Sequence, residues 1–209
     1  MTVTHDRSGP DVLLVRHGQS TWNADGRWQG QADPPLSDIG ERQAAEAAGA
    51  LAGLDVPIDA VWASDLERAR RTGEIVAEAL GLEVRLDPRL RERHAGPWQG
   101  LTRDEIDIEW PDHLSSGRRP EGYEADADVL ARVLAALADL ARAHPRGHVL
   151  VVTHGGVVRV VERHLGGDDG ALLPNLSGRR IRGGAGGTWA LGDPVLLLDE
   201  GSVTVPGQL

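Results

Sequence analysis

The stretch Asp11-Val12-Leu13-Leu14-Val15-Arg16-His17-Gly18 is the part of the 209-residue sequence that decides the fold. Its four central apolar residues, bounded by polar ones, are typical of a strand buried on both faces of a parallel sheet. The apolar run ends abruptly at Arg16 and His17. Because open α/β sheets bind ligands at the carboxyl ends of their strands, we expect this pair to reach a ligand site. The alternative is that both residues merely end a strand at the surface.

The composition restricts the class of protein before any motif is considered. A chain of this length predicts one domain, residues 11–209, after a flexible N-terminus of residues 1–10. The formal net charge of −10 argues against nucleic acid and anionic membranes as partners. The sequence has no cysteine, which excludes thiolate metal sites, and no lysine, which excludes a P-loop or Schiff-base lysine. No apolar run reaches the roughly 18 residues of a membrane span, so we expect a cytoplasmic protein.

Strand and helix patterns alternate along the chain. Short apolar runs predict strands at 12–15, 60–63, 83–87 and 149–153. Apolar residues at helical spacing predict helices at about 37–54, 64–80, 125–144 and 157–165. Strands that alternate with helices imply an α/β fold, which we expect to be a three-layer α/β/α sandwich around a mostly parallel sheet.

Two stretches have the spacing of a capping box, in which a serine or threonine is followed three residues later by glutamate. Residues 64–67 open the helix that runs to Leu80, and residues 102–105 open a short helix. The C-terminal part has weaker patterns. We predict a flexible arginine- and glycine-rich loop at 179–187. Closing strands are predicted after it at 188–191, 195–198 and 202–205.

Titratable and cationic side chains arrive at the ends of the predicted strands. His17 and His154 each follow a buried strand, and Glu92 lies just beyond another. Arg68 lies in the first turns of the helix after the second strand. Arginine offers a planar fork of donors that matches phosphate oxygens, and its charge cannot be titrated away. With Arg16 as the second arginine, two histidines and two arginines at one sheet edge predict an anion site.

Five blocks of the sequence together resemble the histidine phosphatase superfamily, the phosphoglycerate-mutase-like proteins. They occur in the family's order and cover most of residues 11–160: Arg16-His17-Gly18-Gln19-Ser20-Thr21-Trp22-Asn23, Gln29-Gly30 with Pro35-Leu36-Ser37-Asp38-Ile39-Gly40, Ser64-Asp65-Leu66-Glu67-Arg68-Ala69, Leu90-Arg91-Glu92 with Trp98-Gln99-Gly100, and Val152-Thr153-His154-Gly155-Gly156. The first block and the loop around Glu92 are most similar to the branch that contains glucosyl-3-phosphoglycerate phosphatase and broad-specificity phosphatases. The resemblance implies a phosphoglycerate-mutase-like fold and a phosphomonoesterase that needs no metal and no cofactor.

The resemblance assigns roles to the residues at the matching positions. It implies that His17 is the nucleophile that becomes phosphohistidine, and that Glu92 protonates the leaving oxygen and then activates water. Neutral imidazole has a free lone pair near neutral pH, which suits this attack. Its other ring nitrogen is expected to be held by a backbone carbonyl. The implied phosphate contacts, which would neutralise the phosphoryl charge without a metal, are Arg16, Asn23, Gln29, Gly30, Arg68, His154 and Gly155.

Three alternatives stay open at this point. A phosphoglycerate mutase would use the same residues, and Arg118 and Arg119 resemble the paired arginines of mutases. The mutase pattern, however, has asparagine where this chain has Gly156, and it uses a lysine that this chain lacks. An inactive binding protein on the same fold is the second alternative. The third is that Glu92 belongs to a surface network with its neighbouring arginines.

The substrate is expected to be a small phosphorylated metabolite of the sugar phosphate or phosphoglycerate type. Residues 100–130 and 168–187 are predicted to cover the pocket as cap segments. The family resemblance also allows a homodimer, although no patch in the sequence points to an interface.

Overall fold

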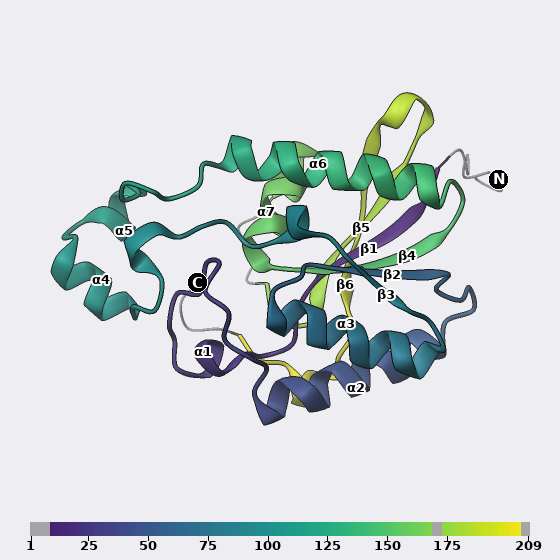
Figure 1. Cartoon of the computed structure of the whole chain (residues 1–209), viewed down its shortest axis with the longest axis horizontal. Helices are drawn as coiled ribbons and strands as arrows, with labels where there is room; N and C mark the ends of the chain where they lie inside the picture. Colours follow the sequence, from purple (N-terminus) through teal and green to yellow (C-terminus); the bar gives the residue numbers. More distant parts are fainter. Residues whose placement is uncertain (1–8, 169–172, 206–209) are drawn as a thin grey trace.

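The computed structural model describes residues 9–168 and 173–205. Its strands form a six-stranded sheet in the order β3-β2-β4-β1-β5-β6 (Figure 1). The strands β3, β2, β4 and β1 are parallel, whereas β5 runs antiparallel to β1 and β6 antiparallel to β5. The bounds of the strands are β1 Asp11–Arg16, β2 Ala60–Ala63, β3 Val84–Leu86, β4 His148–Thr153, β5 Ser177–Gly183 and β6 Trp189–Leu196. Most of the predicted flexible N-terminus, residues 1–8, lies outside the described residues.

Helices cover both faces of the sheet (Figure 1). Successive side chains of a strand point to opposite faces, and β1 uses both. Val12 and Leu14 pack in one cluster with α6 and α7, whereas Leu13 and Val15 pack in another with α2 and α3. The helices that form these outer layers are α2 Asp38–Ala52, α3 Glu67–Leu80, α6 Asp126–Ala143 and α7 Gly155–His164. The predicted three-layer α/β/α fold around a mostly parallel sheet is confirmed.

A smaller unit projects from one end of the molecule (Figure 1). It contains α4 (Arg103–Glu109) and α5 (His113–Ser116) and has a core of its own around Trp98 and Ile106, both with 0% exposure. The predicted capping box of α4 is confirmed, because Thr102 and Glu105 each bond the other's backbone amide. This unit belongs to the predicted cap segment 100–130.

The predicted capping box at Ser64 is wrong. Helix α3 begins at Glu67 after Leu66, whose apolar side chain cannot accept a hydrogen bond. The backbone amide of Ser64 bonds to the carbonyl of Val152 at 3.0 Å, just beyond the end of β2. Its hydroxyl accepts from the amide of Leu66 at 3.3 Å and lies 2.9 Å from Nε2 of His154, so it contacts both the helix start and the site.

The C-terminal part is more regular than predicted. The expected flexible loop at 179–187 contains most of strand β5, which pairs with β1 along its length. The two predicted strands at 188–191 and 195–198 are largely covered by the single strand β6. The predicted strand at 202–205 is wrong, because a short 3-10 turn at Glu200–Ser202 occupies its start and residues 203–205 form no strand. No helix in the described part of the chain is both long and apolar enough to cross a membrane.

Candidate active site

The parallel pairing of β1 with β4 brings the two histidines of the sequence blocks together. Arg16 pairs with Thr153 in register, and the backbone amide of His17 bonds to the carbonyl of Thr153 at 2.9 Å. His154 follows Thr153 and is the N-cap residue of α7. The rings of His17 and His154 therefore meet edge to face, with centroids 5.2 Å apart. Both side chains are almost completely buried.

The two nitrogens of His17 have different surroundings. Nδ1 lies 2.6 Å from the carbonyl oxygen of Gly18. Because a carbonyl can only accept a hydrogen bond, we infer that Nδ1 carries the proton. Nε2 then presents its lone pair to Nε of Arg68, which donates to it at 3.2 Å. The geometry leaves Nε2 as the nitrogen that carries the lone pair, with Nδ1 held by a backbone carbonyl.

The environment of His17 favours its neutral form. Burial lowers the pKa of His17 well below 6.5, and the nearby charges of Arg68 and Arg16 lower the pKa further. The bond from Nδ1 to Gly18 acts in the opposite direction but is the smaller effect. A histidine with a lowered pKa keeps its lone pair through neutral and mildly acidic pH. The imidazole is thus ready to act as a nucleophile without first losing a proton.

Arg68 is held by two backbone carbonyls and by the ring of His17. Its Nη1 donates to Ala32 at 2.9 Å and its Nη2 to Gly30 at 2.8 Å, while Nε points at His17. Burial lowers the pKa of Arg68 to about 10, and Glu92 acts to raise it. The guanidinium stays charged at neutral pH. The backbone at position 30 requires a glycine, because its φ is +51° and a Cβ there would collide with Ala95.

Arg16 supplies the second buried cation. Its Nη1 donates to the carbonyl of Leu173 at 3.0 Å, and its buried Nε has no hydrogen-bond partner within the described part of the chain. Burial lowers the pKa of Arg16 to about 9, with Glu92 raising it and Arg159 and Arg68 lowering it. Arg16 is 3% exposed. A buried arginine with an unused donor is suited to bind an anion that enters the site.

His154 has one ring nitrogen bound and one free. Nε2 contacts the Ser64 hydroxyl, whereas the buried Nδ1 finds no partner among residues 9–168 and 173–205. Burial, followed by the charge of Arg68, lowers the pKa of His154 well below 6.5. His154 lies against His17 beneath the cavity and is not one of the residues that line it.

The carboxylate of Glu92 is held by backbone amides. One oxygen accepts from the amide of Arg93 at 2.8 Å and the other from the amide of Gly156 at 3.0 Å, in the first turn of α7. In the alternative, Glu92 belongs to a surface network with Arg91 and Arg93, but both arginines form ion pairs with other carboxylates. Arg91 pairs with Asp65 and Arg93 with Asp126.

The predicted phosphate contacts from the first loop divide into two groups. Gln29 lines the cavity, and its Oε1 accepts from the Ser20 hydroxyl at 2.7 Å. Asn23 lies in the short helix α1 (Thr21–Ala24), and the cavity lining does not include it. Its Oδ1 accepts from the Ser20 amide, and its buried Nδ2 is without a partner in the described residues.

A cavity of about 530 Å³ opens above these groups. Seven of the predicted site residues line it: Arg16, His17, Gln29, Gly30, Arg68, Glu92 and Gly155. The predicted cap segment contributes Gly117, Arg119 and residues 123–126, whereas the described residues 173–187 contribute none. Among residues 9–168 and 173–205, no group of three or more histidine, aspartate or glutamate side chains could hold a metal ion.

One wall of this cavity is basic, and the sequence blocks do not predict it. Arg93, Arg159 and Arg163 line it, and their roles are not given by the sequence blocks. The spacing of α7 carries a signal, because Arg159 follows Gly155 by four residues and lies on the same helix face. Its half-buried guanidinium has a buried Nε without a hydrogen bond in the described residues.

Comparisons with known proteins show the family to which the chain belongs. The family model of the histidine phosphatase superfamily (branch 1) matches residues 12–180. Glucosyl-3-phosphoglycerate phosphatase from Mycobacterium tuberculosis is 38% identical over 167 residues, which cover 74% of each chain. Metal-independent phosphoserine phosphatase from Arabidopsis thaliana is 38% identical over 72% of this chain and 66% of its own.

A solved structure is similar as well. The mycobacterial glucosyl-3-phosphoglycerate phosphatase complexed with VO3 matches with a TM-score of 0.77 and 33% identity, over 88% of this chain and 97% of that chain. The phosphatase names of these relatives support the predicted phosphomonoesterase over the mutase. The chain belongs to branch 1 of the histidine phosphatase superfamily.

Proposed function

We propose that the protein hydrolyses phosphomonoesters of small metabolites through a covalent phosphohistidine on Nε2 of His17. One observation carries this proposal: His17 has its Nδ1 bound to the Gly18 carbonyl and its lone pair beside Arg68. The same imidazole has a pKa well below 6.5 because of burial and the two arginines. The relatives named as phosphatases support the reaction type.

The first step transfers the phosphoryl group to the enzyme. Nε2 of His17 forms a bond to phosphorus while the bond between phosphorus and the ester oxygen breaks. Glu92 gives its proton to the departing oxygen, so the product leaves as a neutral alcohol. The charges of Arg16 and Arg68 stabilise the phosphoryl oxygens during this transfer, and the free Nδ1 of His154 is a further contact.

The second step regenerates the enzyme. Glu92, now ionised, takes a proton from a water molecule, whose oxygen bonds to phosphorus as the bond to Nε2 breaks. Inorganic phosphate leaves, His17 is again neutral, and Glu92 is again protonated. The amides of Gly156 and Arg93 hold the carboxylate in place for both steps.

The charges of the cavity wall support a substrate with a second anionic group. Asp126 pairs with Arg93 and Arg163, and Arg132 holds Glu124, so these wall carboxylates are already neutralised. Arg159 adds a cation near Arg16, and Arg119 adds another above the ring of Tyr123. A phosphomonoester that also carries a carboxylate fits this distribution, as in phosphoglycerates and phosphoserine. We therefore favour this class over phosphate esters of uncharged sugars.

Two substrates that differ in one group test the proposal. 3-Phosphoglycerate and glycerol 3-phosphate share the ester, but only the first has a carboxylate. We expect both to be hydrolysed in the presence of EDTA, with kcat/KM for 3-phosphoglycerate higher by about 10-fold or more, because a charge-assisted hydrogen bond contributes about 1.5–3 kcal/mol. Turnover of neither would contradict a phosphatase, whereas equal turnover would contradict the carboxylate preference.

The mutase alternative is opposed by the residue at 156. A Cβ on Gly156 would lie 3.0 Å from Cδ of Glu92, so the asparagine of the mutase pattern would displace this carboxylate. Adding 2,3-bisphosphoglycerate to the assay with 3-phosphoglycerate tests the point. We expect phosphate release to remain faster than formation of 2-phosphoglycerate; the reverse order would establish a mutase.

The setting of the enzyme is part of the same proposal. We place it in the cytoplasm, because charged phosphorylated metabolites do not cross membranes unaided, and neither nucleic acid nor a membrane takes part in the reaction. Cell fractionation checks the location. The homodimer remains a prediction from the family resemblance, to be measured by light scattering, and an inactive binding protein would show no turnover in any of these assays.

A further inference from the structure

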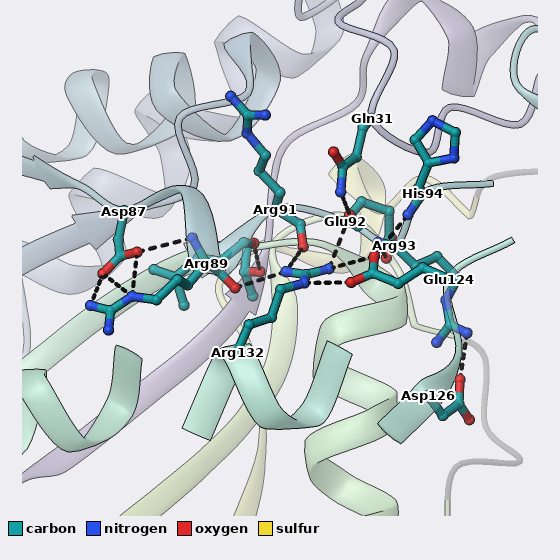
Figure 2. A network of polar contacts seen from close by, with 12 residues as sticks. Gln31, Asp87, Arg89, Arg91, Glu92, Arg93, His94, Glu124, Asp126 and Arg132 are labelled. Carbon is teal, nitrogen blue, oxygen red and sulfur yellow. Dashed lines mark hydrogen bonds and ion pairs between the residues drawn. The ribbon is translucent and has the colours of Figure 1, made fainter. Parts of the chain in front are cut away.

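All five N–H donors of Arg132 are used. It lies in the second turn of α6, with its side chain 19% exposed, and its guanidinium is at the centre of a polar network (Figure 2). Nε and Nη2 bind the two carboxylate oxygens of Glu124 at 2.8 and 3.0 Å. A guanidinium has five N–H donors, and three remain for other partners.

Those three donors hold the loop that carries Glu92. Nη1 donates to the carbonyls of Arg89 at 2.7 Å and Arg91 at 2.5 Å, and Nη2 donates to the carbonyl of Glu92 at 3.2 Å (Figure 2). The remaining support comes from the main domain. Thr153 donates to the carbonyl of Leu90 at 2.7 Å, and Gln31 donates to that of Glu92 at 3.1 Å.

The same arginine connects this loop to the cap segment. Glu124 accepts from the amide of His94 at 2.9 Å through its carboxylate, and its own amide donates to the carbonyl of His94 at 2.9 Å. Glu124 lines the cavity together with Glu92. Arg132 therefore joins three parts of the molecule: helix α6, the loop of residues 89–92, and the cap.

We propose that Arg132 is a positioning residue that sets the place of the Glu92 carboxylate relative to the leaving group. The inference rests on the proposed function, in which Glu92 is the proton donor. The amides of Arg93 and Gly156 bind the Glu92 side chain, but they can align it only if the backbone at residue 92 is fixed. A planar fork is needed to hold converging carbonyls on one side and a carboxylate on the other, which lysine cannot do.

An Arg132→Lys variant tests this assignment, because lysine keeps the charge and loses the fork. Misplacement of a proton donor by about 1 Å can cost about 100-fold, and this cost depends on the leaving group. We expect kcat/KM for 3-phosphoglycerate, an alkyl ester, to fall about 10- to 100-fold, and that for p-nitrophenyl phosphate to fall less than about 3-fold. The ratio of the two values does not depend on the folded fraction of the sample.

Matched controls separate positioning from stability. Arg142 lies on the same helix, and its side chain is 74% exposed. The Arg142→Lys variant should therefore have the wild-type ratio of the two kcat/KM values. In a Glu92→Gln background, Arg132→Lys should change the ratio no further, because the group it positions is absent. Glu124→Gln keeps the carbonyl bonds of Arg132 and should shift the ratio in the same direction by less.

The outcomes are distinct. A ratio that shifts in Arg132→Lys but not when it is added to Glu92→Gln supports the assignment. Equal losses on both substrates, or a further shift of the ratio in the double variant, would overturn it. If Glu92→Gln alone leaves the ratio unchanged, the proton-donor role of Glu92 in the proposed function is wrong, and the inference falls with it.

Discussion

The floor of the cavity and its wall hold their charged groups in different ways. The floor consists of Arg16, His17 and Arg68, with His154 packed directly beneath His17, and all four are at most 3% exposed. Its two arginines and His17 are held by backbone carbonyls. The wall includes Arg93, Arg119 and Arg159, which are half-buried or exposed. Because backbone partners hold the floor groups, whereas the wall consists of side chains that single substitutions can replace, we assign the proposed chemistry to the floor and the proposed choice of substrate to the wall.

The most damaging change to the floor is loss of the nucleophile. We expect His17→Asn to lower kcat by at least about 10³-fold on every substrate, because the remaining groups cannot form a covalent bond to phosphorus. The variant should have the wild-type far-UV circular dichroism spectrum. Retention of more than a tenth of the activity in a folded variant would place the nucleophile elsewhere.

Glu92 lines the same cavity, and the loss of activity on replacing it should depend on the substrate. Glu92→Gln keeps the shape but cannot give a proton, so we expect kcat/KM to fall about 10²- to 10⁴-fold for 3-phosphoglycerate. The loss for p-nitrophenyl phosphate should be much smaller, since its leaving group needs no acid. Steady-state kinetics with both substrates measures the contrast. An identical loss with both would remove Glu92 from the role of proton donor.

A change on the wall should alter selectivity alone. We expect Arg159→Gln to lower kcat/KM for 3-phosphoglycerate by about 10-fold, as loss of one charged hydrogen bond would, and to leave glycerol 3-phosphate within about 2-fold. Arg142→Gln, at an exposed position on α6, is the matched control. A similar fall with both substrates would assign Arg159 to the binding of the phosphoryl group and so to the floor.

The buried histidines of the floor should make stability depend on pH. The pKa values of His17 and His154 are lowered on folding by burial, so below pH 6.5 the unfolded chain binds more protons than the folded one. Stability is therefore lost as pH falls from 6.5 toward the folded pKa values, by up to about 1.4 kcal/mol per pH unit for each histidine. Urea unfolding at pH 7.5, 6.5 and 5.5 measures this slope. It should be shallower in His17→Asn; a slope equal to that of the wild type would mean that His17 is not buried in its neutral form.

Much of the fold can be read from the sequence because the decisive elements have strong local patterns. The apolar runs of β1 and β4 and the helical spacing of α6 place the central sheet and one outer layer. Strand β5 has no such pattern, because its sequence consists of serine, glycine and arginine apart from the buried Ile181. Its arginines are neutralised by distant partners, Arg179 by Glu162 and Arg180 by Asp11. Only the folded chain brings these carboxylates near.

The site divides in the same way. The strand ends and the family blocks are enough to name His17, Arg68 and Glu92, which the structure brings to one cavity. The blocks do not tell how each group is held. The contact of His17 with the Gly18 carbonyl depends on local backbone conformation. The contacts that place Arg68 and His154 join residues 36 and 90 positions apart in the chain. The role of Arg132 is hidden for the same reason.

The central claim is that phosphate is carried on one nitrogen of one histidine. It is tested most directly by quenching the enzyme in alkali during turnover and recording the ³¹P NMR spectrum of the denatured protein. We expect a phosphohistidine substituted at Nε2, absent from His17→Asn, because Nδ1 of His17 is bound to the Gly18 carbonyl. Substitution at Nδ1, a signal that persists in His17→Asn, or no phosphoenzyme under conditions where substrate is consumed would contradict it.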